Sequence, residues 1–427
     1  MLDRSIQPEV KPISQINIPE PKVFRSSNGV DFHIIDMGDQ EVVRIDLIFC
    51  AGKWDQGKLL QSMFTNLLLK EGVEGMTSQE VAEQLDYYGA WLQPSATFHN
   101  SYVSLYSLNK HAKNTFPLLE KIVKKPSFLQ HEFDVIKDRR FQNFLVEEER
   151  VHVTAFNEFV HCLYGDKYPY GQHAKKEHFD NLTLQDIKDY HKEYYNSHNC
   201  RIILTGRITD EIMEQALACF GNEKWGNEKD KEEKSFEATP SAPGRFFIEK
   251  SDALQSAVRI GLPIIGREHP DYPKLRVLNT LLGGYFGSRL MANIREDKGY
   301  TYGIGSSITT LKNASYLSIS SQVATQFTES LIKEVFVEID RLKEELVGDE
   351  ELQMLKGYLL GEMARLFDGP FSIADAHQSL LANNMSVSYY YQMIDAIHSV
   401  TAEELKILAR KYFIEDNFYT IVSGEKI

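Results

Sequence analysis

Two side chains in the second half of the chain, Arg295 and Tyr302, could act together on a carbonyl oxygen. A tyrosine hydroxyl can donate a hydrogen bond to an oxygen that becomes negatively charged, and an arginine can hold a second carbonyl with its planar fork of donors. Positioned donors of this kind lower the barrier to acyl transfer by several kcal/mol. Taken alone, the same two residues are equally compatible with a surface arginine in an ion pair and a strand tyrosine in a hydrophobic core.

The histidines do not form a pattern that predicts a metal site. His173 and His178 are five residues apart, about 140° around a helix, so they do not converge on one ion and are expected on the surface. His152 and the pair His161-Cys162 fall in a predicted helix that should pack inside, where hydrogen-bonded core histidines are expected. The chain also lacks a G-x-S-x-G elbow, a P-loop and a dinucleotide fingerprint. The residues alone therefore predict no metal ion in this chain.

Composition and charge are typical of a soluble globular protein. The chain has 427 residues, 42% apolar and 25% charged, which suffices for two domains with separate cores. The net charge of −14 argues against a nucleic-acid partner, because phosphate binding needs a basic surface. No signal peptide, presequence or apolar run of the roughly 20 residues that span a membrane is recognisable, so a cytoplasmic protein without membrane contact is expected. The four cysteines are expected to be reduced, buried thiols: Cys50, Cys162, Cys200 and Cys219.

The order of predicted elements repeats once, with a period of roughly 214 residues. TNLLL at 65–69 is echoed by NTLLG at 279–283, and GAWL at 89–92 by GIGS at 303–306. The pattern predicts an α+β fold of two homologous domains, each an antiparallel-rich sheet packed by helices. We expect the first domain at 1–222, a linker at 223–243 and the second domain at 244–427. The polar run at 221–234 offers nothing to a core and is expected to be a solvated linker.

Periodicity places the individual elements. Alternating apolar residues predict strands at 43–50 and 101–107 and at 255–264 and 316–322, and helical periodicity predicts helices at 111–123, 133–149, 326–345 and 349–366. A further helix is expected to begin near Trp54. In the extended stretch at 91–106, Pro94 lacks a backbone donor, which marks an edge strand.

Several motifs resemble those of the insulinase/pitrilysin zinc peptidases over nearly the whole chain. They include LLGGYFGSRL at 281–290, IREDKGYTY at 294–302 and YPYG at 168–171. In that family the pattern R-E-x-x-G-x-x-Y supplies an arginine and a tyrosine that reach the zinc site of a first domain. By position these are Arg295 and Tyr302 here. The residues that keep the motif in register are Gly283, Gly284, Ser288, Arg289 and Gly299.

The zinc signature of the family is missing. In H-x-x-E-H two histidines share one helix face and grip zinc, while the Glu between them activates a water. The matching positions here hold Ser62, Thr65 and Asn66, none of which is a strong zinc ligand. The third ligand of the family, a Glu on a later helix, falls at or near Asn143.

The resemblance implies a non-catalytic subunit of a two-chain zinc peptidase, similar to the alpha subunit of mitochondrial processing peptidase. The partner would be a catalytic chain with H-x-x-E-H, which would hold the zinc, while this chain would hold no cofactor. Arg295 and Tyr302 would act in trans on peptide substrates. In the family the strand matching 91–106 receives a peptide as an added strand, whereas a structural strand is the expectation for this chain. A homodimer is the alternative assembly. The alternative function is a non-enzymatic peptide-binding or structural protein, as in family members that serve as scaffolds in respiratory complexes.

Overall fold

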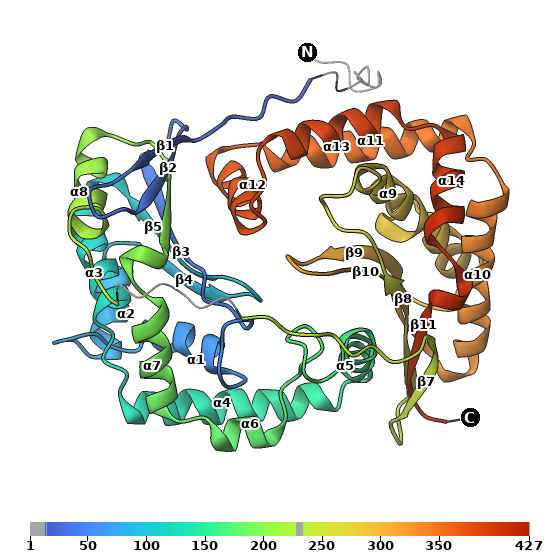
Figure 1. Cartoon of the computed structure of the whole chain (residues 1–427), viewed down its shortest axis with the longest axis horizontal. Helices are drawn as coiled ribbons and strands as arrows, with labels where there is room; N and C mark the ends of the chain where they lie inside the picture. Colours follow the sequence, from blue (N-terminus) through green and yellow to red (C-terminus); the bar gives the residue numbers. More distant parts are fainter. Residues whose placement is uncertain (1–12, 14, 228–233, 427) are drawn as a thin grey trace, which may run out of the picture.

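The computed structural model describes residues 13, 15–227 and 234–426 and contains two β-sheets of nearly the same topology (Figure 1). The first sheet has the strand order β1-β2-β6-β3-β5-β4, and the second has the order β7-β11-β8-β10-β9. Neighbouring strands are antiparallel except β2 with β6 and β7 with β11, which are parallel. The two orders match strand for strand once β1 is set aside. The predicted α+β fold with two sheets packed by helices is confirmed.

The strands of the first sheet are β1 Lys22–Arg25, β2 Asp31–Asp36, β3 Val42–Phe49, β4 Trp91–Ala96, β5 Ser101–Leu108 and β6 Cys200–Gly206. Those of the second are β7 Gly244–Glu249, β8 Gln255–Pro263, β9 Ile304–Thr310, β10 Ser315–Ala324 and β11 Tyr419–Gly424.

The helices of the first half are α1 Gln61–Leu68, α2 Ser78–Tyr87, α3 Ala112–Lys124, α4 Gln130–Glu148, α5 Val151–Tyr164, α6 Lys176–Asn181, α7 Leu184–Tyr194 and α8 Asp210–Phe220. Those of the second are α9 Tyr272–Asn279, α10 Thr328–Glu344, α11 Asp349–Leu366, α12 Pro370–Ala382, α13 Ser388–Ser399 and α14 Ala402–Tyr412, with π-helical segments at Thr280–Gly284 and Met291–Asp297.

The predicted elements are present, with one displaced start. All four predicted strands and all four predicted helices occur, and no end shifts by more than three residues. The helix expected from Trp54 begins only at Gln61, so that prediction is wrong by two turns. The intervening chain forms turns, in which Asp55 Oδ2 accepts the Gly52 N–H at 3.1 Å, and Leu60 has a φ of 75°, which a helix cannot contain.

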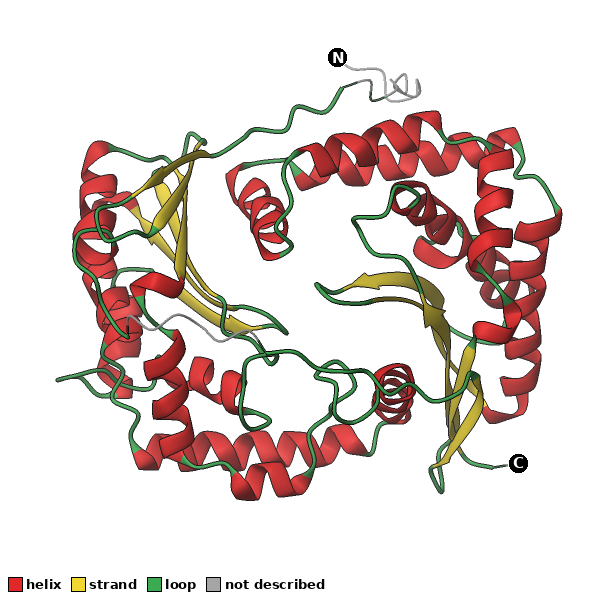
Figure 2. Ribbon diagram, in the orientation of Figure 1, coloured by secondary structure: helices red, strands yellow, loops and turns green. Residues whose placement is uncertain are grey.

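Each half lends one helix to the other half's sheet. Helix α5 packs on β8 and β11 of the second sheet, where Phe159 lies in one cluster with Tyr316 and Ile421. Helix α12 packs on β2 and β6 of the first sheet, where Ile373 lies in one cluster with Ile203. In Figures 1 and 2 the other helices lie mainly on the outer sides of the sheets, and α5 and α12 lie between them. The packing units therefore differ from the chain halves by one helix on each side.

The linker is more firmly anchored than expected. Trp225 is partly buried against the first core. Lys124 Nζ lies over its ring, 5.3 Å from the ring centroid. Beyond residues 228–233, which lie outside the described residues, the Lys234 carbonyl accepts the Trp54 indole N–H at 3.1 Å, and Phe236 packs on the α5 cluster. The prediction that nothing in the run 221–234 packs a core is therefore wrong at Trp225.

The turns of the two β-hairpins meet between the halves. The β4–β5 turn contains His99, whose Nε2 lies 2.5 Å from the Tyr170 hydroxyl. The same hydroxyl accepts the backbone N–H of Asn313, in the β9–β10 turn, at 3.2 Å. A single tyrosine from the sequence YPYG thus ties both hairpins together. None of the helices in the described ranges combines the length and the hydropathy that a membrane span requires.

Candidate functional site

The three positions that would carry a zinc signature face the interior of the first half. Ser62, Thr65 and Asn66 on α1 are all at most 2% exposed. Thr65 Oγ1 donates to the Gln61 carbonyl at 2.8 Å, and Asn66 Nδ2 donates to Ser101 Oγ at 2.7 Å. These hydrogen bonds attach α1 to its own backbone and to strand β5, so Thr65 and Asn66 have structural partners.

Tyrosines from helix α7 fill the space beside these residues. The Tyr190 hydroxyl donates to the Gly52 carbonyl at 3.0 Å, and the Tyr194 hydroxyl donates to the Asp55 carbonyl at 3.1 Å. Their rings lie 4.6 Å apart. Burial raises the pKa of Tyr190 and of Tyr195 well above the ordinary value, so both phenols stay neutral. Tyr190 and Tyr194 are four residues apart and share one helix face, a pattern that can be read from the sequence.

These residues do not fit zinc. Ser62 Oγ and Asn66 Oδ1 are buried without a hydrogen-bond partner in the described part of the chain, but neutral oxygens suit calcium or magnesium better than zinc. Asn143 on α4 is exposed and does not join them, whereas the neighbouring Phe144 packs inward against Phe179. Within the described ranges, no three His, Cys, Asp or Glu side chains are grouped closely enough to hold a metal ion.

The remaining histidines and the cysteines have separate environments. His173 is half-buried, and burial lowers its pKa. His178 accepts the Lys175 backbone N–H at 2.8 Å at the start of α6, and His152 on α5 is exposed, contrary to the expectation that it lies in a core. His161 is half-buried. All four cysteines are free thiols; Cys162, Cys200 and Cys219 are buried as predicted, and Cys50 is half-buried.

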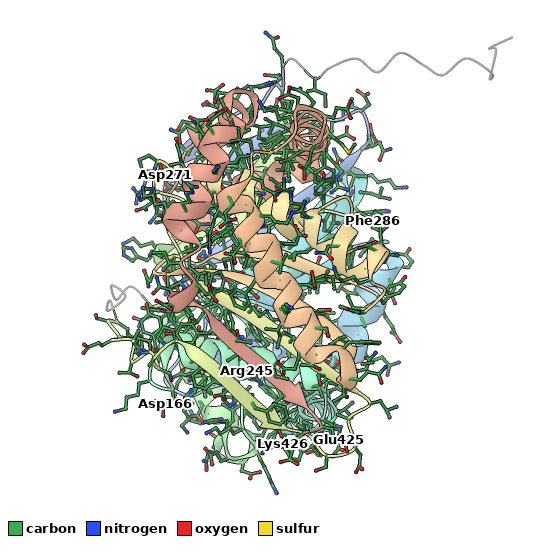
Figure 3. The ribbon with its side chains drawn as sticks, turned by 90° about the vertical axis from the view of Figure 1, so that its right-hand side faces the viewer. Asp166, Arg245, Asp271, Phe286, Glu425 and Lys426 are labelled. Atoms are coloured by element: carbon green, nitrogen blue, oxygen red, sulfur yellow. The ribbon has the colours of Figure 1, made fainter. Side chains whose placement is uncertain are left out.

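Arg295 and Tyr302 lie together on the surface of the second half. The Arg295 Cζ is 4.6 Å from the ring centroid of Phe286 and 5.4 Å from that of Tyr302, so the guanidinium is sandwiched between two rings. Tyr302 is 92% exposed, which rules out the alternative of a core aromatic. Figure 3 shows Phe286 at the edge of the molecule, opposite Asp271. Cation–π contacts of this kind stabilise the position of an exposed ring.

The glycines and polar residues of the same motif support this pair. A Cβ on Gly283 would lie 2.7 Å from the Ser306 backbone nitrogen, so only glycine lets the π-helical segment approach β9. Gly299 has a φ of 64° in the turn that separates Arg295 from Tyr302. Arg289 forms two hydrogen bonds of 2.9 Å to the Glu351 carboxylate on α11. The motif is therefore a rigid platform, and π-helical segments such as the one that carries Arg295 are frequent at functional sites.

The remaining members of the motif are packed residues. Ser288 is fully buried, and a Cβ on Gly284 would lie 3.2 Å from the Thr280 side chain. Gly284 therefore lies close to the preceding turn of the π-helical segment.

A cleft lies between the halves, beside the edge of the first sheet. Its cavity has a volume of about 550 Å³. One wall is the face of β3, β4 and β5, and the other is formed by α12 and the end of β9. Strand β4 is the edge strand that Pro94 predicted, and its side chains Gln93 and Ser95 line the cavity. Polar, uncharged groups beside a free strand edge suit the main chain of an extended peptide.

A buried ion network at the base of this cleft was missed in the sequence. Arg44 Nε lies 2.7 Å from Asp46 Oδ2, and an Arg44 terminal nitrogen lies 2.6 Å from Asp375 Oδ1 on α12. Ser104 Oγ donates to Asp46 at 2.5 Å. Burial alone would lower the pKa of Arg44, but the charges of Asp46 and Asp375 outweigh it and raise that pKa. The available signal was a pair of charges on one face of an otherwise apolar strand.

A histidine pair lies on the same interface. His377 Nε2 on α12 is 3.0 Å from His33 Nδ1 on β2. Burial, with a smaller contribution from the His33 ring, lowers the pKa of His377 to about 4, and burial also lowers the pKa of His33. Both rings are therefore neutral at pH 7, and one ring donates the shared hydrogen bond to the other.

Comparison with known proteins agrees with the resemblance seen in the sequence. Residues 181–359 match the family model described as the peptidase M16 inactive domain. The chain is 24% identical over 382 residues, 85% of its length, to 88% of a Bacillus subtilis protein described as an uncharacterized zinc protease, YmxG. It is 22% identical, over 92% of its length, to 90% of a Helicobacter pylori protein described as a non-peptidase homolog, YmxG.

The similarity to solved structures is stronger in fold than in sequence. The crystal structure of a peptidase M16 inactive domain from Pseudomonas fluorescens superposes with a TM-score of 0.84 at 24% identity. It covers 95% of this chain and 98% of its own. The two-sheet architecture is thus that of M16 structures. Residues 181–359 thus resemble the inactive domain of M16 peptidases, and the chain as a whole is similar to M16 peptidase-like proteins, with Ser62, Thr65 and Asn66 at the positions of the zinc signature.

Proposed function

We propose that this chain is the non-catalytic subunit of a two-chain zinc peptidase and supplies Arg295 and Tyr302 to the zinc site of a partner chain. The observation that carries the proposal is the contrast between the two motifs. The zinc positions are filled by neutral, buried side chains, whereas Tyr302 is 92% exposed and in contact with Arg295. An exposed tyrosine is available to another chain. It contributes nothing to the hydrophobic core of its own chain.

In such a complex this chain's residues would do two things. The Tyr302 hydroxyl would donate a hydrogen bond to the oxyanion that forms at the cleaved peptide carbonyl. The Arg295 guanidinium would hold the Tyr302 ring by the contact already present and offer its remaining donors to a peptide carbonyl. The zinc would belong to the partner, a chain with H-x-x-E-H.

The test is the substitution Tyr302→Phe, measured on the mixture with such a partner. We expect peptide hydrolysis to fall by about 10²–10³-fold, the usual effect of removing one oxyanion donor, while the complex still forms. Tyr87→Phe is the matched control, because Tyr87 is 82% exposed and lies on α2 of the first half. Unchanged hydrolysis in a complex that forms with Tyr302→Phe would exclude the proposed role.

Zinc content per purified chain gives an independent check. A value near zero agrees with a subunit that holds no metal. A value near one would mean that Ser62, Thr65 and Asn66 were wrongly aligned with the zinc signature, and the half-buried His161 and His173 would then be the first ligands to test.

A second candidate function is supported by the cleft. A peptide-binding or scaffold protein of the same fold would use the free edge of β4 and the adjoining cavity of about 550 Å³, and it would need neither Arg295 nor Tyr302. Under this alternative, Tyr302→Phe leaves every activity of the complex unchanged.

A further inference from the structure

A second cavity adjoins the cleft between the halves, which we call the central cleft. It is lined by positive charges, whereas the chain as a whole is acidic. Its volume is about 480 Å³, within the usual range for ligand sites. It shares His99, Asn100, Lys312 and Ala382 with the cleft beside β4, so the two cavities adjoin. Four separate segments form it: the end of the first sheet, the linker, the β9–β10 turn and the end of α12.

Three cationic side chains line this second cavity, which we call the basic cavity. They are Arg201 on β6, Lys234 at the end of the linker and Lys312 in the β9–β10 turn. In a chain of net charge −14, such a grouping is contrary to the overall balance. Among the described residues, no carboxylate oxygen lies within 4.0 Å of a charged nitrogen of any of these three side chains.

The nearby carboxylates are otherwise engaged. Asp55, the one acidic residue in the lining, is 1% exposed, and its Oδ2 accepts the Gly52 N–H at 3.1 Å. Lys234 Nζ donates to the backbone carbonyl of Asp55 at 2.5 Å. Asp31 stands opposite Arg201 on β2 but lies 3.9 Å from the Arg25 guanidinium. The positive charges of the basic cavity can therefore interact with an anionic ligand.

We propose that the basic cavity binds carboxylate groups of an acidic peptide segment that lies in the central cleft. Arginine matches a carboxylate with two parallel hydrogen bonds, and lysine adds a point charge that suits either carboxylate oxygen. A peptide extended along β4 runs past Gln93 and Ser95 and brings its next residues to His99 and Lys312. The inference rests on the peptide-holding part of the proposed function and names its substrate class.

The experiment is a direct binding measurement on the isolated full chain. A fluorescein-labelled peptide with three glutamates among serines and glycines is compared with the same peptide carrying glutamines, by fluorescence anisotropy at low and at moderate salt. We expect the glutamate peptide to bind at least about tenfold more tightly at low salt, with a difference that shrinks as salt screens the charges. Amidating the peptide's C-terminus distinguishes a terminal carboxylate, whose binding is then lost, from side-chain carboxylates, whose binding remains.

Two substitutions locate the binding. Lys312→Glu, in an exposed turn, and Arg201→Gln should each weaken the glutamate peptide about tenfold and leave the glutamine peptide unaffected. The matched control is Lys110→Glu, the same charge change at an exposed lysine outside both cavities. Equal binding of both peptides, or an effect of Lys110→Glu as large as that of Lys312→Glu, would overturn the proposal. So would tighter binding of an oligonucleotide of equal charge, which would make the cavity a phosphate site.

The outcome is independent of catalysis, because no partner chain is present. A chain that binds the glutamate peptide as described, but whose complex is indifferent to Tyr302→Phe, holds acidic peptides without acting in trans. If the glutamate peptide does not bind preferentially but Tyr302→Phe lowers hydrolysis by the complex, the chain supplies Tyr302 to a partner and does not select acidic peptides.

Discussion

The two helix–sheet contacts that join the halves occupy corresponding places but are built from different chemistry. On the first sheet, Arg44 of β3 meets the carboxylates of Asp46 and Asp375. On the second sheet, Arg259 of β8 meets the rings of Phe156 and Phe159, with its Cζ 4.9 and 5.9 Å from their centroids. Burial lowers the pKa of Arg259, because no carboxylate offsets it.

The neighbouring residues explain the divergence. Two positions beyond each arginine, β3 has Asp46 and β8 has Gly261. A Cβ on Gly261 would lie 2.7 Å from Phe159 Cζ, so the aromatic ring of α5 takes the space that a carboxylate occupies on the other sheet. One contact therefore depends on charge, salt and pH, and the other depends on packing. We expect the α12 contact to weaken first when conditions change.

The largest expected difference comes from replacing the arginine of each contact by leucine and comparing the unfolding free energies. Arg44→Leu leaves the fully buried Asp46 without its cation and should cost about 3–5 kcal/mol of unfolding free energy. Arg259→Leu strands no charge and should cost about 1–2 kcal/mol, the value of a desolvated cation–π contact with one hydrogen bond to Ser318. Urea denaturation of both variants measures the difference.

The control for this pair is the double variant Arg44→Leu/Asp46→Leu. It removes the stranded charge and should recover most of the lost stability. Equal losses for Arg44→Leu and Arg259→Leu would mean that the ion network has no special cost.

Acid should weaken the α12 contact, which contains the His33–His377 pair. Because the folded pKa values of His33 and His377 are lowered, the unfolded chain takes up protons first as the pH falls. Stability present above pH 6.5 is then lost toward pH 4, by an amount on the order of 1–2 kcal/mol for the pair. Near the pair, the Asp31 charge opposes the lowered pKa of His33 and the Arg201 charge adds to it.

The measurement is unfolding free energy as a function of pH in the wild type and in His377→Gln. We expect a shallower dependence between pH 7 and pH 5 in the variant. His191, buried with a pKa of about 4, contributes equally to both proteins, so the difference between them isolates the interface. Identical pH profiles would contradict a role for the pair.

The smallest effect should come from the exposed end of the network. Asp375 is 64% exposed on its side chain, and Arg44 keeps Asp46 without it, so Asp375→Asn should cost less than about 1 kcal/mol. Raising the salt concentration should abolish this cost. Phe156→Leu on α5 is the matched change, also small, and its cost should not fall with salt. A salt-independent cost for Asp375→Asn would contradict the charge-based account of this contact.

The sequence was most informative where the physics is local. Helix α11 was predicted to the residue from helical periodicity. Its first turn holds Asp349, Glu350 and Glu351, where acidic side chains favour a helix start. Strand β4 was recognised as an edge from Pro94 alone. By contrast, the start of α1 depends on turns fixed by Asp55 and on the left-handed Leu60, neither of which has a periodic signal.

The long-range features could not be obtained in the same way. Nothing in the residues of α5 or α12 says which sheet each will cover, because both present an apolar face that fits either. The Arg44–Asp46 pair was visible as two charges on one strand face, but its third member, Asp375, lies in the other half of the chain. For the site, Arg295 and Tyr302 were found through a motif, while the cations of the basic cavity come from three segments that only folding brings together.

The exchange of α5 and α12 sets an order of events during synthesis. The first sheet is complete once β6 has left the ribosome, but the helix that covers its inner face, α12, is made only near the end of the chain. At roughly 5–20 residues per second, that face waits many seconds for its cover. We therefore expect a chain truncated before α12 to leave the face of β2 and β6 uncovered rather than to form a smaller stable unit.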